Sequence, residues 1–392
     1  MDSPISQWNH IITKNYLQTE TENQYFERKG LGDSGIKPTK IADELIGMLN
    51  AQGGVLVFGV SDTGEIQDLR CLGNKLDDYR RLVFDFIVFP CPVRLEEIEL
   101  DGKLIFLYHV PLDWEHLYCR KDNQKIFLRV ADSNMELNWA QIKQLEYSRN
   151  LRRFEDETVA DFDPTDLDEH LLSQYKQAMN MEKGDALDLL YSRHLIDKKD
   201  GRICFKKAAV LLFARNPERY ISSASVRYIR YANRRADSDK QIVQDRWFED
   251  NIPSLINTLG NVLRDELCGN HCDISGECLY PEEAWMEGII NALCHRSYFI
   301  HGNAVYIRHF DDCLEICNSG SLHAPVTIEN MRNARFSRNP RIARVLEDFK
   351  FVRQLNQGVS RIYRSMAQAQ LAEPEYCTQN GNVCLILRRE NQ

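Results

Sequence analysis

The stretch from Glu22 to Asp62 most constrains the fold of this chain, because it predicts a helix followed at once by a buried strand. Apolar residues in its helical part recur at intervals of four, seven and eight positions, the spacing of a half-buried helix: Ile41, Leu45, Met48 and Leu49. Gly53-Gly54 ends this helix, and the apolar run 55–60 is typical of a strand bounded by turns. We therefore predict a helix over 39–49 and a strand over 55–60.

Three acidic residues surround this helix and strand. Glu22 and Glu27 precede the helix, and Asp62 follows the strand, where an α/β sheet usually exposes functional groups. Glu22 and Glu27 are five positions apart and share no face of a helix or strand, so only the turn before the helix could bring them together. Alternatively, the acids cap the helix and solvate the surface, since charged residues are mostly exposed and Asp is a common turn residue.

Length and charge limit the function classes. With 392 residues, two or three domains are expected. The net charge of -9 argues against a protein that coats nucleic acid non-specifically, although it allows a local basic groove. The 12 cysteines are scattered, and we find neither a secretory signal nor an apolar run that would span a membrane. We expect a soluble, cytoplasmic protein with mostly reduced thiols and no membrane partner.

The pattern along the chain divides it into three segments. Residues 1–150 predict a compact α+β domain whose sheet is mostly antiparallel, with a tight hairpin at Asp101-Gly102. Residues 151–200 predict an acidic, solvated linker followed by a helical stretch over 171–195. Residues 201–392 form the expected second domain, which opens with a helix and a strand.

A cysteine-rich stretch, CGNHCDISGEC, offers four soft ligands within eleven residues: Cys268, His271, Cys272 and Cys278. Their spacing is not that of a usual zinc knuckle, and no second CxxC follows. Both a zinc site and an ordinary loop with reduced thiols remain open at this point.

The segment 281–298 carries a second set of chemically useful residues. Proline and acidic residues at its start favour a helix N-terminus. Glu287, Asn291 and His295 recur every four residues and so lie along one stripe of that helix. A carboxylate, an amide and an imidazole on one stripe could hold a Mg²⁺–phosphate group and orient water. Alone, such a stripe is more typical of a surface helix.

The residues after this helix strengthen the binding interpretation. A hairpin turning at Asp311-Asp312 is followed by Asn318-Ser319-Gly320 and by the sequence SRNP at 337–340. A further helix start at 355–361 would direct backbone N–H groups at an anion. Between Met331 and Met366 there are nine Arg or Lys residues but only two acids. A triphosphate or an RNA backbone would complement that charge.

This order of motifs resembles the GHKL ATP-binding fold of gyrase, MutL and Hsp90, in the divergent form found behind Schlafen AlbA-like domains of bacterial proteins. The resemblance implies an α/β sandwich in which Asn291 ligates Mg²⁺, Glu287 is a candidate base and Asn318 faces the adenine. It implies this set of ATP-binding residues: Glu287, Asn291, His295, Arg296, Asn318, Gly320, Arg338, Asn339, Gln357 and Gly358. The chain departs from the family where Asn318 replaces an Asp and where the second glycine box keeps only Gly358. ATP binding is expected, and hydrolysis is left open.

The opening stretch resembles the Schlafen AlbA-like domain, on the pattern E-x4-E, a helix, N-x-x-GG and GVxD. The matching positions are Glu22, Glu27, Lys29, Asn50, Gly53-Gly54, Gly59-Val60 and Asp62, with Arg28 where the family has an aromatic residue. In the branch that cleaves tRNA and rRNA, two glutamates and an aspartate form a metal-dependent nuclease site. The resemblance thus implies that Glu22, Glu27 and Asp62 bind Mg²⁺ or Mn²⁺ and that Lys29 contacts the phosphate.

Three functions follow as hypotheses. The first is an ATP-binding, metal-dependent nuclease, with RNA favoured over DNA as substrate and phage defence as a fitting role. The second is a nucleotide-responsive, DNA-binding transcriptional regulator without catalysis, although we find no convincing helix-turn-helix. The third is an ATPase that remodels a partner. Both resemblances lead us to expect a homo-oligomer.

Overall fold

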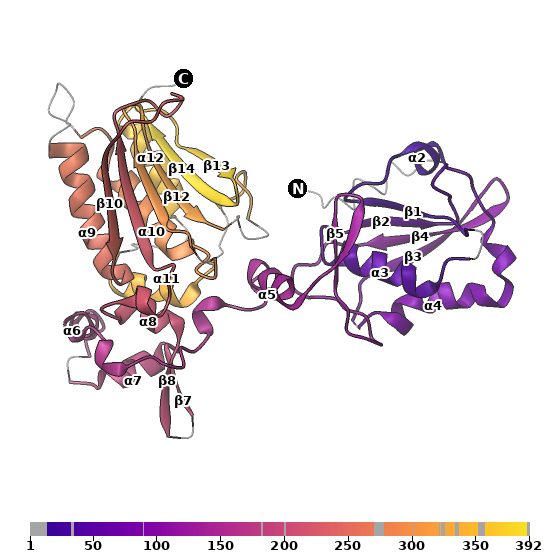
Figure 1. The fold of residues 1–392 in the computed structure, drawn as a ribbon, viewed down its shortest axis with the longest axis horizontal. Coiled ribbons are helices and arrows are strands. Elements are labelled where there is room, and N and C mark those ends of the chain that lie inside the picture. Colours follow the sequence, from indigo (N-terminus) through magenta and orange to yellow (C-terminus); the bar gives the residue numbers. More distant parts are fainter. Residues whose placement is uncertain are drawn as a thin grey trace. The chain divides into compact units, whose positions relative to one another are not determined.

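The computed structural model describes residues 14–32, 35–88, 90–181, 183–199, 201–269, 278–300, 302–320, 322, 326–333, 337–351 and 357–389. The chain divides into two compact units, Met1–Leu151 and Arg152–Gln392. Helices and sheets occur in both, so the predicted α+β class is confirmed (Figure 1).

The first unit is built on a four-stranded sheet of order β1-β2-β4-β3. Its first pair is parallel and the others are antiparallel: β1 (Phe26–Lys29), β2 (Gly54–Phe58), β3 (Arg94–Leu100) and β4 (Lys103–Val110). The hairpin between β3 and β4 turns at Asp101-Gly102, as predicted. Both turn residues have positive φ, 50° and 73°, which a two-residue hairpin of this kind requires.

Helices pack on both faces of this sheet. One face is covered by α3 (Pro38–Leu49) and α4 (Leu76–Phe86), and the other by the short α2 (Lys14–Thr19). Alternation along β1 directs Phe26 toward α2 and Glu27 toward α3, because neighbouring strand residues point to opposite faces. The hairpin of β5 (Phe127–Val130) and β6 (Ser133–Glu136) packs on α3, and α5 (Trp139–Ser148) follows.

The N-x-x-GG motif has a structural explanation. Asn50 follows α3, and its side-chain Nδ2 donates to the carbonyls of Tyr118 at 2.7 Å and Phe127 at 3.0 Å. Its Oδ1 accepts the backbone N–H of Tyr118 at 2.8 Å. Gly54 has φ 140°, and a Cβ there would overlap the carbonyl of Tyr25. The motif therefore joins α3, β1 and β5 at the start of β2.

The second unit contains a six-stranded sheet of order β10-β9-β11-β12-β14-β13, drawn from red to yellow in Figure 1. Only the β9–β11 pair is parallel. The strands are β9 (Ser225–Tyr231), β10 (Ile242–Glu249), β11 (Val305–His309), β12 (Cys313–Ser319), β13 (Glu375–Gln379) and β14 (Asn382–Arg388).

Three helices lie together on one face of this sheet (Figure 1): α9 (Ile252–Arg264), α10 (Glu282–His295) and α12 (Gly358–Gln368). The central helix, α10, lies so close that a Cβ on Gly288 would be 2.9 Å from Ile316 of β12 and Leu385 of β14. The helix α11 (Pro340–Asp348) precedes α12 in the chain.

Residues 152–200, expected to be a linker and one helical stretch, are part of the second unit. The helical stretch is broken into α6 (Glu169–Ala178) and α7 (Ala186–Ser192), because Asn180 adopts a positive φ of 55° and Asp185 caps a new helix. The hairpin of β7 (Ile196–Lys199) and β8 (Arg202–Phe205) and the helix α8 (Lys207–Phe213) follow. Tyr175 of α6 is fully buried and packs on Phe213, which holds this segment in the core.

Candidate functional site

The predicted stripe on α10 lies against the first turn of α12. Glu287 is buried, and Asn291 and His295 are half-buried. A Cβ on Gly358 would overlap Glu287 Oε1 and lie 3.2 Å from Asn291 Nδ2. Only glycine allows this approach, so the Gly358 backbone and the α10 stripe form one surface.

The carboxylate of Glu287 is balanced by a cation from α12. Burial raises the pKa of Glu287, and Arg361, whose Nη2 lies 2.7 Å from Oε2, opposes that shift. Asn291 Nδ2 is buried and has no hydrogen-bond partner among the described residues. A buried donor without a partner costs about 1–3 kcal/mol, which a polar ligand would recover.

His295 lies at the other end of the stripe. Burial and the nearby charge of Arg338 lower the pKa of His295 to about 4, so its imidazole is neutral at pH 7. Burial also lowers the pKa of Arg338 to about 10, which leaves its guanidinium charged. Gly320, with φ 107°, directly follows β12. It lies against Arg338, since a Cβ at this position would be 2.9 Å from Arg338 Nη1.

The end of β12 adds further polar groups. Asn318 alternates with Cys317 and shares the α10 face with Ile316. The backbone N–H of Ser297 donates to the carbonyl of Ser319 at 2.9 Å. Both serine hydroxyls are buried without a hydrogen-bond partner among the described residues. This junction of α10 and β12 therefore offers several polar groups to a ligand.

Two residues of the expected ATP-binding set make internal contacts instead. Arg296 is fully buried and donates to the carbonyls of Ser225, at 3.4 Å, and Asn303. Asn339 Nδ2 donates to the carbonyls of Cys294 at 2.8 Å and Arg296 at 2.9 Å, which closes the C-terminal end of α10. Both position the helix. Gln357, by contrast, is exposed at the N-cap of α12.

The basic segment 331–366 is less one-sided than its sequence indicates. Acidic partners from other parts of the unit pair with several of its arginines: Arg332 with Glu373, Arg341 with Asp156, and Arg361 with Glu287. Arg335 and Arg353 lie outside the described residues. The charge balance of residues 331–366 alone does not include these acidic partners, because they lie outside that segment of the sequence.

A cavity of about 530 Å³ adjoins the Glu287–Arg361 pair. Its lining comes from α9, α10, α12 and the residues after α11: Ile256, Asn257, Glu282, Glu283, Met286, Glu287, Ile290, Lys350, Phe351 and Arg361. Apart from Glu287, no lining residue belongs to a sequence motif, because most of them are ordinary members of three helices.

In the first unit, the three predicted metal ligands have different surroundings. Glu22 Oε1 accepts the backbone N–H of Arg28 at 3.0 Å. Glu27 is buried on the α3 face and pairs with Lys29. Asp62 is exposed in the turn after β2. Arg28 points to the opposite face, where its Nη1 donates to the carbonyl of Gln18 at 2.7 Å.

Two residues that sequence reasoning missed complete the surroundings of Glu27. Arg129 of β5 is fully buried, and its Nη2 lies 2.6 Å from Glu27 Oε2. Glu44 of α3 is also buried, with Lys29 Nζ at 3.8 Å and Arg129 Nη1 at 3.9 Å. One feature of the sequence indicated that Glu44 is buried: it lies directly before Leu45, near the apolar side of α3.

The chemistry of Glu22, Glu27 and Asp62 suits a hard cation, since all three offer carboxylate oxygens. However, they are not among the described acidic, histidine and cysteine groups whose ligand atoms lie within 4.8 Å of one another. The arrangement does not form a metal shell around Glu27, which contacts Lys29 and Arg129 instead.

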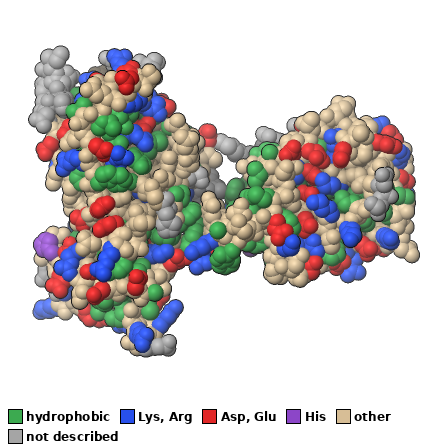
Figure 2. All heavy atoms as spheres, viewed as in Figure 1, with side chains coloured by type: hydrophobic (Ala, Val, Ile, Leu, Met, Phe, Trp, Pro, Cys, Tyr) green, Lys and Arg blue, Asp and Glu red, His purple; other side chains and the backbone are tan. Residues whose placement is uncertain are grey.

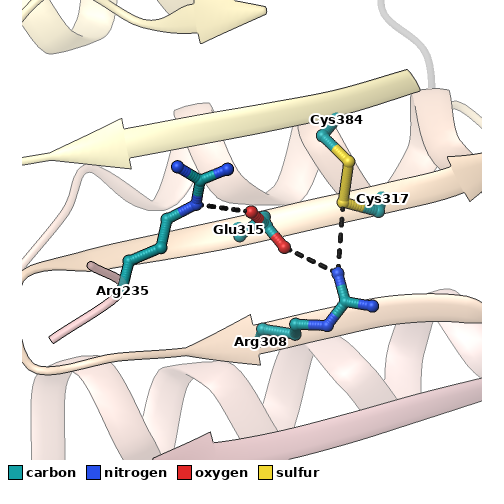
Figure 3. Close-up of a disulfide and its surroundings, with 5 residues drawn as sticks. All are labelled: Arg235, Arg308, Glu315, Cys317 and Cys384. Carbon is teal, nitrogen blue, oxygen red and sulfur yellow. Dashed lines mark hydrogen bonds and ion pairs between the residues drawn. A yellow bond between two sulfur atoms is a disulfide. The ribbon is translucent and has the colours of Figure 1, made fainter. Parts of the chain in front are cut away.

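Four cysteines are paired in the second unit. Cys268 and Cys278 form a disulfide, so these two thiols are not zinc ligands here, and His271 and Cys272 lie outside the described residues. Cys317 and Cys384 form the second disulfide, beside the buried Glu315 (Figure 3). The other seven cysteines in the described part of the chain are free thiols.

The outer surface has a mixed charge. On the face in view in Figure 2, acidic and basic side chains are interspersed over both units. None of the described helices is both long and apolar enough to cross a membrane.

Comparisons with known proteins match one segment in each unit. Residues 22–138 match the family model described as "Schlafen, AlbA_2", and residues 302–387 match the one described as "Putative ATP-dependent DNA helicase recG C-terminal". No curated protein matches the chain. Among solved structures, the DIP2311 protein from Corynebacterium diphtheriae is similar, with 18% sequence identity and a TM-score of 0.49. That similarity covers 93% of this chain and 64% of the other, so the chain spans less than two-thirds of that protein.

Proposed function

We propose that this chain, in which a Schlafen AlbA-like domain precedes an ATPase-like domain as its motifs predicted, binds ATP in its second unit and acts on nucleic acid with its first. The observation that carries the proposal is the approach of Gly358 to Asn291. There, a buried amide without a partner among the described residues faces the first turn of an eleven-residue helix.

Each group at this junction has a role toward Mg-ATP. The N-terminal turn of α12 offers backbone N–H groups to phosphate oxygens. Asn291 would hold Mg²⁺, and the ion would supply charge neutralisation for the phosphates. Arg338 adds a positive charge beside the neutral His295. Asn318 would meet the adenine. Glu287 orders the site through Arg361 and is the candidate base, so hydrolysis depends on its protonation state.

For the first unit we propose a nuclease that prefers RNA, with DNA as the other substrate. Glu22, Glu27 and Asp62 would hold Mg²⁺ or Mn²⁺ after Glu27 exchanges its contacts with Lys29 and Arg129 for the metal, and Lys29 would then contact the phosphate. Three buried charges, on Glu27, Glu44 and Arg129, lie beside the half-buried Lys29 and support a functional centre, since burying charges is costly even when they are paired. Homo-oligomerisation, a cytoplasmic location and a role in phage defence belong to the same proposal.

A cleavage assay tests this proposal. The full chain would be incubated with tRNA, single-stranded DNA and double-stranded DNA, with Mg²⁺ or Mn²⁺, in the presence and absence of ATP. We expect cleavage of tRNA that Glu27→Gln abolishes and that Glu65→Gln, an exposed acid of the same unit, leaves unchanged. If no substrate is cut, or if the Glu27→Gln variant cuts at the wild-type rate, the nuclease proposal is wrong.

A second function, a non-catalytic nucleotide-responsive regulator that binds DNA, is favoured by one observation. Lys29 and Arg129 already neutralise Glu27. Asp62 is exposed, and among the described residues it forms no cluster of metal-ligand atoms with Glu22 and Glu27. This function predicts DNA binding that changes with ATP and no cleavage. A mobility-shift titration with and without ATP, performed beside the cleavage assay, distinguishes the two functions.

A further inference from the structure

Three cysteines form one row across the strands β12, β14 and β13. Cys384 of β14 lies directly opposite Cys317 of β12 on one side and directly opposite Cys377 of β13 on the other. Directly opposite residues of antiparallel strands have side chains on the same face. That face points away from α10, because Cys317 and Cys384 alternate with Ile316 and Leu385, which lie against Gly288 of α10. Cys377 packs with Ile386 on the same face. Cys384 is therefore in the middle of the row.

The register makes either neighbour a suitable disulfide partner. Cys317 and Cys384 are bonded, with their Cα atoms 4.1 Å apart, which identifies a non-hydrogen-bonded pair. In an antiparallel sheet such a residue forms a hydrogen-bonded pair with its other neighbour, at a Cα separation of roughly 5.5 Å. Disulfides most often join Cα atoms about 5.5–6 Å apart, so Cys377 meets the requirement.

The charges around the row favour release of Cys317. Arg308 Nη1 donates to Cys317 Sγ at 3.5 Å and to Glu315 Oε1 at 2.6 Å, as Figure 3 shows. Glu315 is also held by Arg235, whose Nε lies 2.7 Å from Oε2. With two guanidinium groups around one carboxylate, a thiolate on Cys317 would be stabilised by Arg308. A stabilised thiolate is the better leaving group in disulfide exchange.

We propose that this row is a thiol–disulfide exchange site with two alternative disulfides. Cys377, after its proton passes to solvent, attacks Cys384 Sγ. The Cys377–Cys384 bond forms as the Cys317–Cys384 bond breaks, and the electron pair leaves on Cys317 beside Arg308. One disulfide and one thiol exist before and after the step, so no oxidant or reductant is consumed. The covalent link moves from β12 to the edge strand β13.

Peptide mapping of the full chain tests the proposal. The protein would be equilibrated with oxidised and reduced glutathione, quenched with acid, alkylated after denaturation and digested, and the linked peptides would be quantified by mass spectrometry. We expect both Cys317–Cys384 and Cys377–Cys384 peptides from the wild type. The Cys317→Ser variant should form the Cys377–Cys384 disulfide in most molecules. The Arg308→Gln variant keeps all three cysteines, and the share of its molecules with the Cys377–Cys384 disulfide should be at least twofold lower than in the wild type.

The control is Cys313→Ser, on the same strand and face as Cys317 but opposite Arg388 rather than a cysteine. It should leave the ratio of the two disulfides unchanged. Absence of the Cys377–Cys384 peptide from both the wild type and Cys317→Ser would overturn the proposal. The wild-type result stands by itself if Cys317→Ser does not fold, and an unchanged ratio in Arg308→Gln would refute the role of Arg308.

Discussion

Gly358, the first residue of α12, lies directly against the carboxylate of Glu287 on α10, so that any Cβ at position 358 would overlap Oε1. Arg361, one turn further along α12, pairs with the same carboxylate at 2.7 Å. The two helices are thus joined by a close backbone approach and an ion pair, next to Asn291, whose Nδ2 has no hydrogen-bond partner among the described residues.

Gly358→Ala is expected to separate α12 from α10. The methyl group cannot fit beside Glu287, and overpacking of this kind costs about 1–3 kcal/mol. Affinity for ATP should fall at least tenfold, because the first turn of α12 moves away from Asn291. Urea unfolding and ATP titration measure the two effects. Ser360→Ala, in the same turn, should change neither, and equal ATP affinity in Gly358→Ala would contradict the junction.

Glu27→Ala is expected to destabilise the first unit by about 3–5 kcal/mol, because it leaves the fully buried Arg129 without its closest carboxylate. Glu27→Gln keeps the volume and should cost less, which makes it the better variant for activity assays. Free energies of unfolding in urea provide the measurement. Glu65→Ala, at an exposed position, should lie within about 0.5 kcal/mol of the wild type. A similar decrease in the free energy of unfolding in both alanine variants would show that the Glu27–Arg129 pair does not stabilise the unit more than an exposed acid does.

Asn50→Ala should also destabilise the first unit, by about 1–3 kcal/mol. The change leaves a backbone N–H and two carbonyls of Tyr118 and Phe127 without their side-chain partner. Asn15→Ala, the same substitution at an exposed position of α2, is the control. Equal stability of the two variants would remove the structural role that we assign to the N-x-x-GG motif.

Glu155 predicts a pH dependence in the second unit. It is fully buried and accepts the backbone N–H groups of Arg341 at 2.9 Å and Ile342 at 3.1 Å, at the start of α11. Burial raises its pKa from 4.5 to about 7. Between these values the folded state binds more protons than the unfolded state, so stability should fall as pH rises through 7, by about 3 kcal/mol.

The comparison of wild type with Glu155→Gln isolates this effect. The amide does not titrate, so the variant should lose this fall in stability between pH 4.5 and 7. His295, whose pKa is lowered to about 4, gives the opposite slope between pH 4 and 6.5 in both proteins and cancels in the difference. Parallel stability curves for the two proteins would show that Glu155 is not the titrating group.

Local patterns predicted the elements well where one side of the chain is consistently apolar. The predicted helix over 39–49 is observed as α3, and the strand predicted over 55–60 is observed as β2, which starts one residue earlier and ends at Phe58. The hairpin at Asp101-Gly102 followed from turn chemistry. The break between α6 and α7 did not, because it depends on Asn180 and Asp185 rather than on apolar spacing.

Site residues were predictable only where helical spacing already aligned them. Glu287, Asn291 and His295 could be placed on one stripe because they are four residues apart. The contacts of Glu287 with Gly358 and Arg361, and of Asn291 with Gly358, involve a helix about 70 residues away and required the tertiary structure. Arg129 was missed for the same reason. Its Nη2 lies 2.6 Å from Glu27 Oε2, but no local pattern links β5 to β1.

The most direct test is calorimetric titration of the full chain with Mg-ATP, in the wild type, Asn291→Ala and Asn261→Ala. Asn261 is an exposed residue of α9, so its substitution is the same chemical change away from the junction. We predict saturable binding to the wild type and to Asn261→Ala, and no measurable binding to Asn291→Ala. Equal affinity in all three proteins, or no binding to the wild type, would contradict a nucleotide site at the Asn291–Gly358 junction.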